Sequence, residues 1–149
     1  MIYYKKPMKP EILNLNLRSA LLYVPDEGLE PFKYNEGEKG FLREKLFCFE
    51  LDENEYLSIE PDKDRLLGRL VFGGQAAGTV QDEGKTLELP EGNYLFAQMR
   101  QLLNREEIGA LAVEIQQEAL WQRLRPGKLL YLRYLFEDNS PVTQLFRPV

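Results

Sequence analysis

The chain has 149 residues, of which 44% are hydrophobic and 29% are charged, and its formal net charge is −5. These values are typical of one soluble globular domain with a real core, and no apolar run approaches the ~20 residues that a membrane-spanning helix needs. The chain has no histidine and a single cysteine, which excludes Cys–His and Ser-His-Asp catalysis and the usual zinc sites. Its acidic balance argues against nucleic acid as a direct partner.

The N-terminal third predicts one strand followed by a long loop. Residues 1–10 lack the continuous apolar core of a secretory signal, so a cytoplasmic location is expected. The first predicted strand is EILNLNLRSALLYV, residues 11–24, because leucines alternate with polar residues before a continuous apolar run. Residues 25–40 are rich in Pro, Gly and Glu and predict a surface loop, with Phe32 and Tyr34 as candidate anchors.

Short strands separated by turns are predicted for the middle of the chain. Residues 41–51 fit a helix or a strand, and a strand from about Lys45 is favoured because the residues that follow alternate. Cys48 in this strand is expected to be a buried, inert thiol. Tyr56–Ile59 predicts another short strand. The glycine-rich residues 73–78 lack G-x-G-x-x-G and Gly-Lys-Ser/Thr, which favours a bend or bulge linking two sheet segments over a phosphate-binding loop.

The second half, residues 86–149, predicts strand, helix, strand and strand. KTLELPEGNYLFAQM gives two short strands or one bent strand, and KLLYLRYLF with VTQLFRPV gives a closing hairpin. Between them lies the one long amphipathic helix, residues 104–124, with Asn104 as N-cap, Glu107 completing a capping box and Pro126-Gly127 as the stop signal. Its apolar stripe consists of Ile108, Leu111, Ala112, Ile115 and Ala119.

These elements predict an α+β fold for residues 1–149, a single domain in which an antiparallel sheet packs on one dominant amphipathic helix. A more detailed alternative is an internal duplication into halves 1–85 and 86–149, each a strand-helix-strand-strand module. The first half shows no helix as clear as that of the second half.

The second half, Thr86 to Val149, resembles one module of the GyrI-like effector-binding family. The resemblance rests on LELPEGNYLFAQM, on the single helix behind it and on the closing QLFRPV. It implies paired strand-helix-strand-strand modules whose sheets enclose an aromatic-lined cleft for organic, often cationic, ligands. The family commonly has a glutamate at the position of Gln144, and a neutral amide can hydrogen-bond a ligand but cannot neutralise a buried cation.

Two groups of side chains are candidates for binding. On the helix, Glu114, Glu118 and Trp121 share a flank that suits a cation through charge and ring quadrupole, and a solvated acidic flank with Trp121 partly buried is the plainer alternative. On the strands, aromatic residues of equal parity share a face, so Tyr131 is expected opposite to Tyr134. The predicted ligand-binding residues are Tyr94, Glu114, Glu118, Trp121, Tyr134, Gln144 and Phe146.

The arginines of the closing hairpin, Arg133 and Arg147, are expected on its water-exposed faces, where they can pair with acidic residues; an anion site is the alternative.

The predicted function is that of a non-catalytic small-molecule-binding module with an aromatic-lined cleft for a mostly apolar organic ligand, a cation being one alternative. No catalytic residue, metal or cofactor is predicted. The first alternative is a protein-interaction or structural module that forms a homodimer through the closing hairpin or an exposed strand edge. The second is a hydrolase or isomerase that uses Glu114 or Glu118 with a tyrosine.

Overall fold

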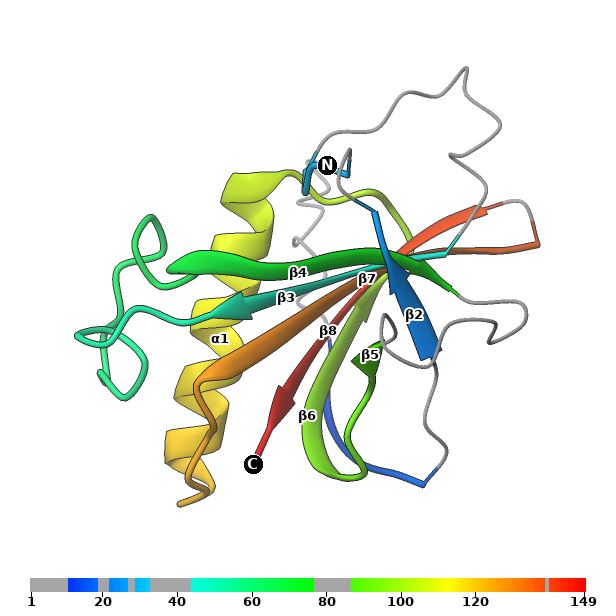
Figure 1. The fold of residues 1–149 in the computed structure, drawn as a ribbon. Coiled ribbons are helices and arrows are strands. Elements are labelled where there is room, and N and C mark those ends of the chain that lie inside the picture. Colours follow the sequence, from blue (N-terminus) through cyan, green and yellow to red (C-terminus); the bar gives the residue numbers. More distant parts are fainter. Residues whose placement is uncertain (1–10, 19–21, 27–28, 33–43, 77–86, 139) are drawn as a thin grey trace, which may run out of the picture.

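The computed structural model describes residues 11–18, 22–26, 29–32, 44–76, 87–138 and 140–149. These residues form one eight-stranded antiparallel sheet and one helix (Figure 1), which confirms the predicted α+β class. The elements in chain order are β1 (Ile12–Leu17), β2 (Leu22–Pro25), β3 (Lys45–Glu50), β4 (Arg69–Ala76), β5 (Leu87–Glu88), β6 (Gly92–Met99), α1 (Arg105–Trp121), β7 (Leu129–Glu137) and β8 (Ser140–Pro148). Across the sheet the strands lie in the order β1-β6-β8-β7-β3-β4-β2-β5.

Helix α1 begins where the sequence predicts. The Asn104 side chain accepts a hydrogen bond from the Glu107 backbone N–H at 2.9 Å, and the Asn104 N–H donates to Glu107 Oε1 at 3.1 Å, so the capping box is confirmed. The whole predicted apolar stripe is buried. The helix ends at Trp121, earlier than expected, because Arg123 has φ of 60° and the Leu124 N–H donates back to the Ala119 carbonyl at 2.8 Å.

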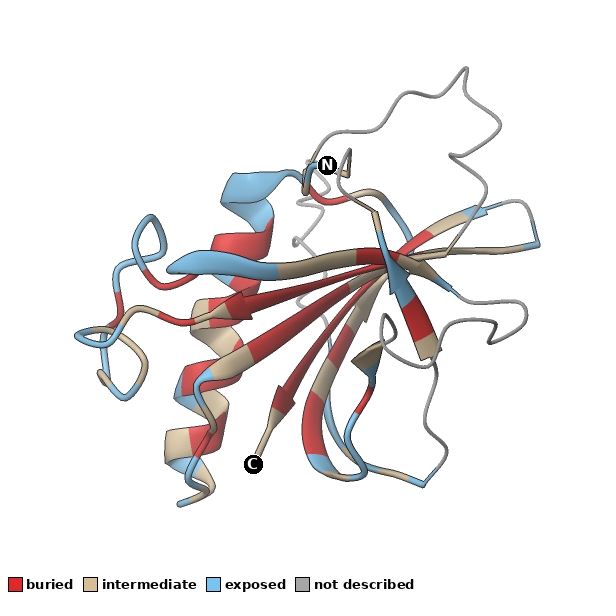
Figure 2. Cartoon of the chain, in the orientation of Figure 1, coloured by how far each residue is buried: buried red, intermediate tan, exposed pale blue. Residues whose placement is uncertain are grey.

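The two faces of the sheet carry separate apolar clusters. The outer face, which α1 covers, has Phe47 and Leu132 among its buried residues, whereas the inner face has Leu46 and Tyr131 from the same strands. The inner cluster also joins Tyr23 of β2 to residues of β6, although four strands lie between β2 and β6 in the sheet order. The sheet therefore curls around its inner face (Figure 1), and buried positions run along the central strands (Figure 2).

Several predicted strands are confirmed. Lys45–Glu50 is a strand, residues 87–99 hold the two short strands β5 and β6, and β7 and β8 pair as the predicted hairpin. Phe32 also acts as an anchor, because its ring stacks on Phe49 with centroids 5.7 Å apart. Tyr34 lies outside the described residues.

Two strand predictions are wrong. Residues 11–24 form not one strand but β1 and β2, which lie far apart in the sheet. Among the described strands β1 pairs only with β6, whereas β2 lies between β4 and β5. Tyr56–Ile59 lies in turns, where the Tyr56 N–H donates to the Asp52 carbonyl.

The glycines at 73 and 74 lie within β4 instead of linking two sheet segments. The register irregularity lies beside them, where Cys48 pairs with Phe72 and Phe49 with Leu70. A Cβ at Gly74 would lie 2.4 Å from the Val24 carbonyl oxygen, so this glycine permits the close approach of β2. Residues 77–78 lie outside the described part of the chain.

Arg147 is not water-exposed, and this prediction is wrong. It points from β8 to the outer face with no exposed surface, because α1 and the loop after β3 cover it. Its guanidinium donates to the Gln116 side chain at 2.6 Å, the Tyr56 carbonyl at 2.6 Å and the Gly127 carbonyl at 3.0 Å. Burial lowers its pKa to about 10, so the side chain stays charged at neutral pH and ties a strand, a helix and two loops together.

We predict that Arg147→Met destabilises the fold by about 2–4 kcal/mol. The variant removes a desolvated charge, but it takes the donor from one buried acceptor, on Gln116, and from two partly buried carbonyls; an acceptor left buried without a donor costs roughly 1–3 kcal/mol. Urea denaturation measures the free energy of unfolding. Arg125→Met, at an exposed position, is the matched control and should change it by less than about 0.5 kcal/mol. Equal stability of both variants would contradict a structural role for Arg147.

Candidate functional site

The inner face of the curled sheet carries a row of aromatic side chains across neighbouring strands. Phe96 on β6, Phe146 on β8 and Tyr131 on β7 follow one another in the strand register, and we refer to them as the aromatic row. Phe96 and Phe146 have ring centroids 5.0 Å apart, and Tyr94 packs edge-on against Phe146 at 6.3 Å. Phe146 and Tyr131 are buried, whereas Phe96 is only partly buried, so Phe96 is the ring that a ligand could reach.

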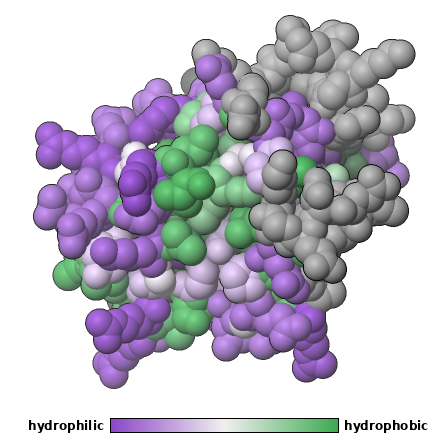
Figure 3. All heavy atoms as spheres, in the orientation of Figure 1, coloured by the Kyte–Doolittle hydropathy of each residue, from purple (hydrophilic) through white to green (hydrophobic). Residues whose placement is uncertain are grey.

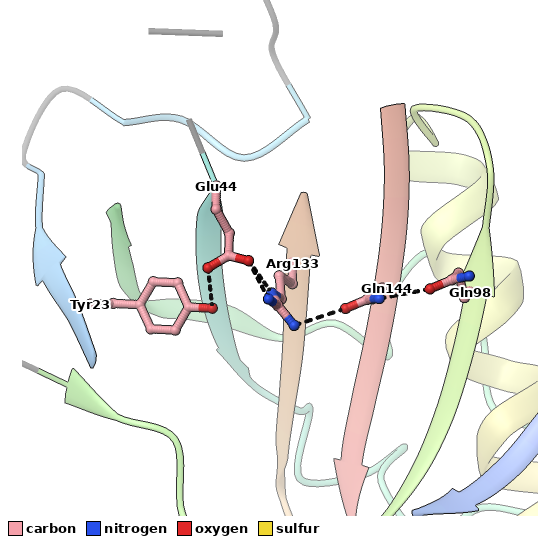
Figure 4. Close-up of polar contacts among 5 residues, drawn as sticks. All are labelled: Tyr23, Glu44, Gln98, Arg133 and Gln144. Carbon is pink, nitrogen blue, oxygen red and sulfur yellow. Dashed lines mark hydrogen bonds and ion pairs between the residues drawn. The ribbon is translucent and has the colours of Figure 1, made fainter. Parts of the chain in front are cut away.

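A row of polar side chains, drawn in Figure 4, lies beside the aromatic row in the strand register. We define the polar row as Gln98, Gln144, Arg133, Glu44 and Tyr23. Gln98, Gln144 and Arg133 are register partners on β6, β8 and β7, each two residues along its strand from a member of the aromatic row. Because side chains of equal parity share a strand face, both rows lie on the inner face.

Hydrogen bonds connect the polar row from end to end (Figure 4). Gln144 Nε2 donates to Gln98 Oε1 at 2.7 Å, and Arg133 Nη1 donates to Gln144 Oε1 at 3.2 Å. Arg133 Nε donates to Glu44 Oε1 at 2.7 Å, and Arg133 Nη2 donates to the same oxygen. The Tyr23 hydroxyl donates to the other oxygen of Glu44 at 3.0 Å.

The ion pair of Arg133 and Glu44 is the electrostatic centre of this row. Their side chains are 18% and 20% exposed, so water screens the pair less than it screens a surface salt bridge. The expectation of a water-exposed Arg133 is therefore wrong, although its predicted pairing with an acidic residue is confirmed. Burial, reinforced by the Glu44 carboxylate, raises the pKa of the Tyr23 hydroxyl, which remains a neutral donor. The opposite charges of Arg133 and Glu44 cancel each other.

Cys48 lies next to the aromatic row, as the register partner of Tyr131. It is buried and forms no disulfide, and burial raises the pKa of its thiol from 9.0 to about 11. The thiolate is the reactive form of cysteine, so the expected inert thiol is confirmed.

The structure brings together three of the seven predicted ligand-binding residues. Tyr94, Gln144 and Phe146 belong to the inner face. Tyr134 lies on the outer face, where its ring is 6.0 Å from that of Phe47 and its hydroxyl donates to the Leu103 carbonyl at 3.4 Å. The predicted opposition of Tyr131 and Tyr134 is thus confirmed.

The other three predicted residues lie on α1, on the opposite side of the sheet from the polar row. Glu114 and Glu118 are partly exposed, and Glu118 accepts a hydrogen bond from the Gln122 side chain at 2.8 Å. Trp121 is 82% exposed, so the expectation that it is partly buried is wrong. The helix turns its indole away from the apolar stripe and into water.

A separate hollow of about 350 Å³ lies near the end of α1, lined by Asn14, Leu15, Asn16, Asn93, Leu124 and Val149. Its asparagines are largely engaged: Asn14 donates to the Gln122 side chain at 3.0 Å, and Asn16 donates to Asn93 at 2.9 Å. None of the predicted ligand-binding residues lines it.

Exposed apolar side chains occur away from the inner face and away from the hollow. Figure 3 shows hydrophobic residues gathered on one face over β4, where Leu70 and Val71 are 40% and 45% exposed. The closing hairpin does not offer a free edge, because β7 and β8 are paired on both sides. Among the described strands, β1 and β5 form the sheet edges.

Sequence reasoning named Gln144 as a ligand-binding residue and Arg133 as a hairpin arginine that pairs with an acidic residue, and it missed the other three members of the polar row. The parity of Gln98 with Tyr94 and Phe96, and that of Arg133 with Tyr131, was the available signal. No comparable signal marks Glu44 or Tyr23. Glu44 reaches the row because β3 lies beside β7, and Tyr23 reaches it from β2 because the sheet curls.

In the described ranges, no helix is long and apolar enough to cross a membrane, and no three metal-ligating side chains gather at one place. Comparison of the chain with protein-family models, with curated proteins and with solved structures found no match. The geometry of the inner face is therefore the feature from which a function is proposed.

We predict that Cys48 makes the fold sensitive to alkali. The unfolded thiol ionises near pH 9, whereas the folded thiol ionises near pH 11. The stability that the neutral thiol provides is therefore present below pH 9 and is lost as the pH rises toward 11, by about 2 kcal/mol. Urea denaturation across this range should show a shallower loss for Cys48→Ala. Tyrosine ionisation is common to both proteins, so identical slopes would contradict this assignment.

Proposed function

We propose that the chain is a non-catalytic small-molecule-binding module whose ligand occupies the inner face of the curled sheet. The observation that carries the proposal is the juxtaposition of the polar row, of which Gln98, Arg133 and Glu44 are partly exposed, with an aromatic row across the same three strands. Ligand sites are characteristically concave and mostly apolar, with a few convergent polar groups that fix orientation. The inner face combines aromatic rings with hydrogen-bonding side chains that lie side by side.

The exposure of each side chain suggests how such a ligand lies. Phe96 offers its partly exposed ring to an apolar body, while the buried rings of Tyr94, Tyr131 and Phe146 support Phe96 from below. Gln144 and its neighbours in the polar row orient the polar group of the ligand. In this arrangement the helix stiffens the outer face and does not contact the ligand.

We also propose that the fold is an internal duplication of the kind implied by the resemblance to the GyrI-like family. The strand order supports this proposal: when β1 to β4 are exchanged with β5 to β8 in turn, the order of the sheet reads in reverse. Superposition of β2-β4-β3 on β6-β8-β7 in an experimental structure should match each strand and its faces. A mismatch of faces would contradict the duplication.

Binding of three naphthalene probes tests the proposed function. They are 2-naphthoate, 2-naphthamide and 2-naphthylmethylammonium, which share an apolar body and differ in polar group. At least one should bind in calorimetry, and its NMR shift changes should centre on β6, β7 and β8. Phe96→Ala should weaken that binding about tenfold, because it removes the accessible ring.

Trp121→Ala is the matched control, since it also removes one aromatic ring but at an exposed position on the helix. Its affinity should equal that of the unmodified protein. If none of the three probes binds, the proposed function fails. Shift changes centred on α1, with a loss of affinity in Trp121→Ala instead of Phe96→Ala, would move the site to the helix.

A further inference from the structure

We propose that the inner face selects ligands whose polar group is a hydrogen-bond acceptor, a carboxylate or a carbonyl oxygen, rather than a cation. This inference rests on the proposed function, because it names the ligand class of the same site. The donors that would meet this oxygen are Gln98 Nε2, at the end of the row, or the N–H groups of Arg133 that make no hydrogen bond within the row. The direction in which each hydrogen bond of the polar row must run favours such a ligand.

Arginine fixes the direction of the row, because a guanidinium has N–H donors and no acceptor. Gln144 must therefore present its Oε1 to Arg133, and its Nε2 then faces Gln98. Gln98 in turn must accept through Oε1, which leaves its own Nε2 outside the row. The orientation of both amides is thus set by chemistry, and the row ends in a donor.

The acceptors of the row are already engaged. Glu44 Oε1 accepts from two nitrogens of Arg133, and Oε2 accepts from Tyr23. By contrast, Arg133 has five N–H groups and makes three hydrogen bonds to described residues, and the Gln98 Nε2 makes none. The groups left for a ligand are therefore mainly donors.

The charges of the polar row also disfavour a cationic ligand. A cation would find its natural partner, Glu44, already neutralised by Arg133, and would lie close to the guanidinium. The next two residues of the row beyond Arg133, Gln144 and Gln98, are neutral amides and offer a cation no charge. A ligand oxygen, in contrast, meets N–H groups beside a guanidinium, where hydrogen bonds are charge-assisted when the acceptor is a carboxylate.

The decisive test is Gln98→Glu, which replaces the free Nε2 with a carboxylate oxygen and keeps an acceptor for Gln144. In the unmodified protein, 2-naphthoate and 2-naphthamide should bind at least about tenfold more tightly than 2-naphthylmethylammonium. The variant should reverse this order by weakening naphthoate and strengthening the ammonium probe. The ratio of naphthoate to naphthamide affinity shows whether the preferred acceptor is charged or neutral.

Gln101→Glu makes the same charge change at an exposed position outside the row and should leave the order unchanged. Thermal unfolding of both variants shows that each is folded during the titrations. If the ammonium probe binds the unmodified protein as tightly as naphthoate does, or if Gln98→Glu leaves the order unchanged, the acceptor preference is wrong while small-molecule binding stands. If no probe binds, the proposed function fails first.

Discussion

An eight-stranded sheet has two faces to shield from water, and helix α1 covers only one of them. The sheet shields the other face by curling, so that Tyr23 on β2 packs in one cluster with Tyr94 on β6. Each buried aromatic ring removes roughly 150–250 Å² of surface from water, and this burial stabilises the curl. The inner face is consequently both a core and a candidate site, and most of its rings are committed to packing.

The same curl constrains polar side chains on both faces. Burying a charge is costly unless hydrogen bonds satisfy it, and within the described residues no buried side-chain nitrogen or oxygen lacks a partner. The two hairpin arginines meet this demand differently. Arg147 is enclosed by carbonyl and amide acceptors from three segments. Arg133 instead pairs with Glu44 near the surface, and two of its five N–H groups make no hydrogen bond to the described residues. Only the second arrangement leaves N–H groups for a further acceptor.

Features that depend on local sequence were predictable. The capping box at Asn104 and the buried stripe of α1 follow from residues three and four apart, and the opposite facing of Tyr131 and Tyr134 follows from strand parity. Burial of Arg147 was not predictable, because it depends on a helix and a loop that close over β8. Prediction of the polar row needed the same tertiary information. Glu44 and Gln98 belong to one row only because Arg133 on β7 and Gln144 on β8 lie between them.

The pairing of the outermost strands joins the N-terminal half of the chain to the C-terminal half. β1 precedes β2 in sequence but pairs with β6, and β5 precedes β6 but pairs with β2. Ile12, for example, lies opposite Ala97. Contacts this distant along the chain require loop closure before they provide stability, which slows folding. Neither half of the chain can therefore complete its part of the sheet in isolation. Cutting the polypeptide near its middle would yield two interdependent fragments.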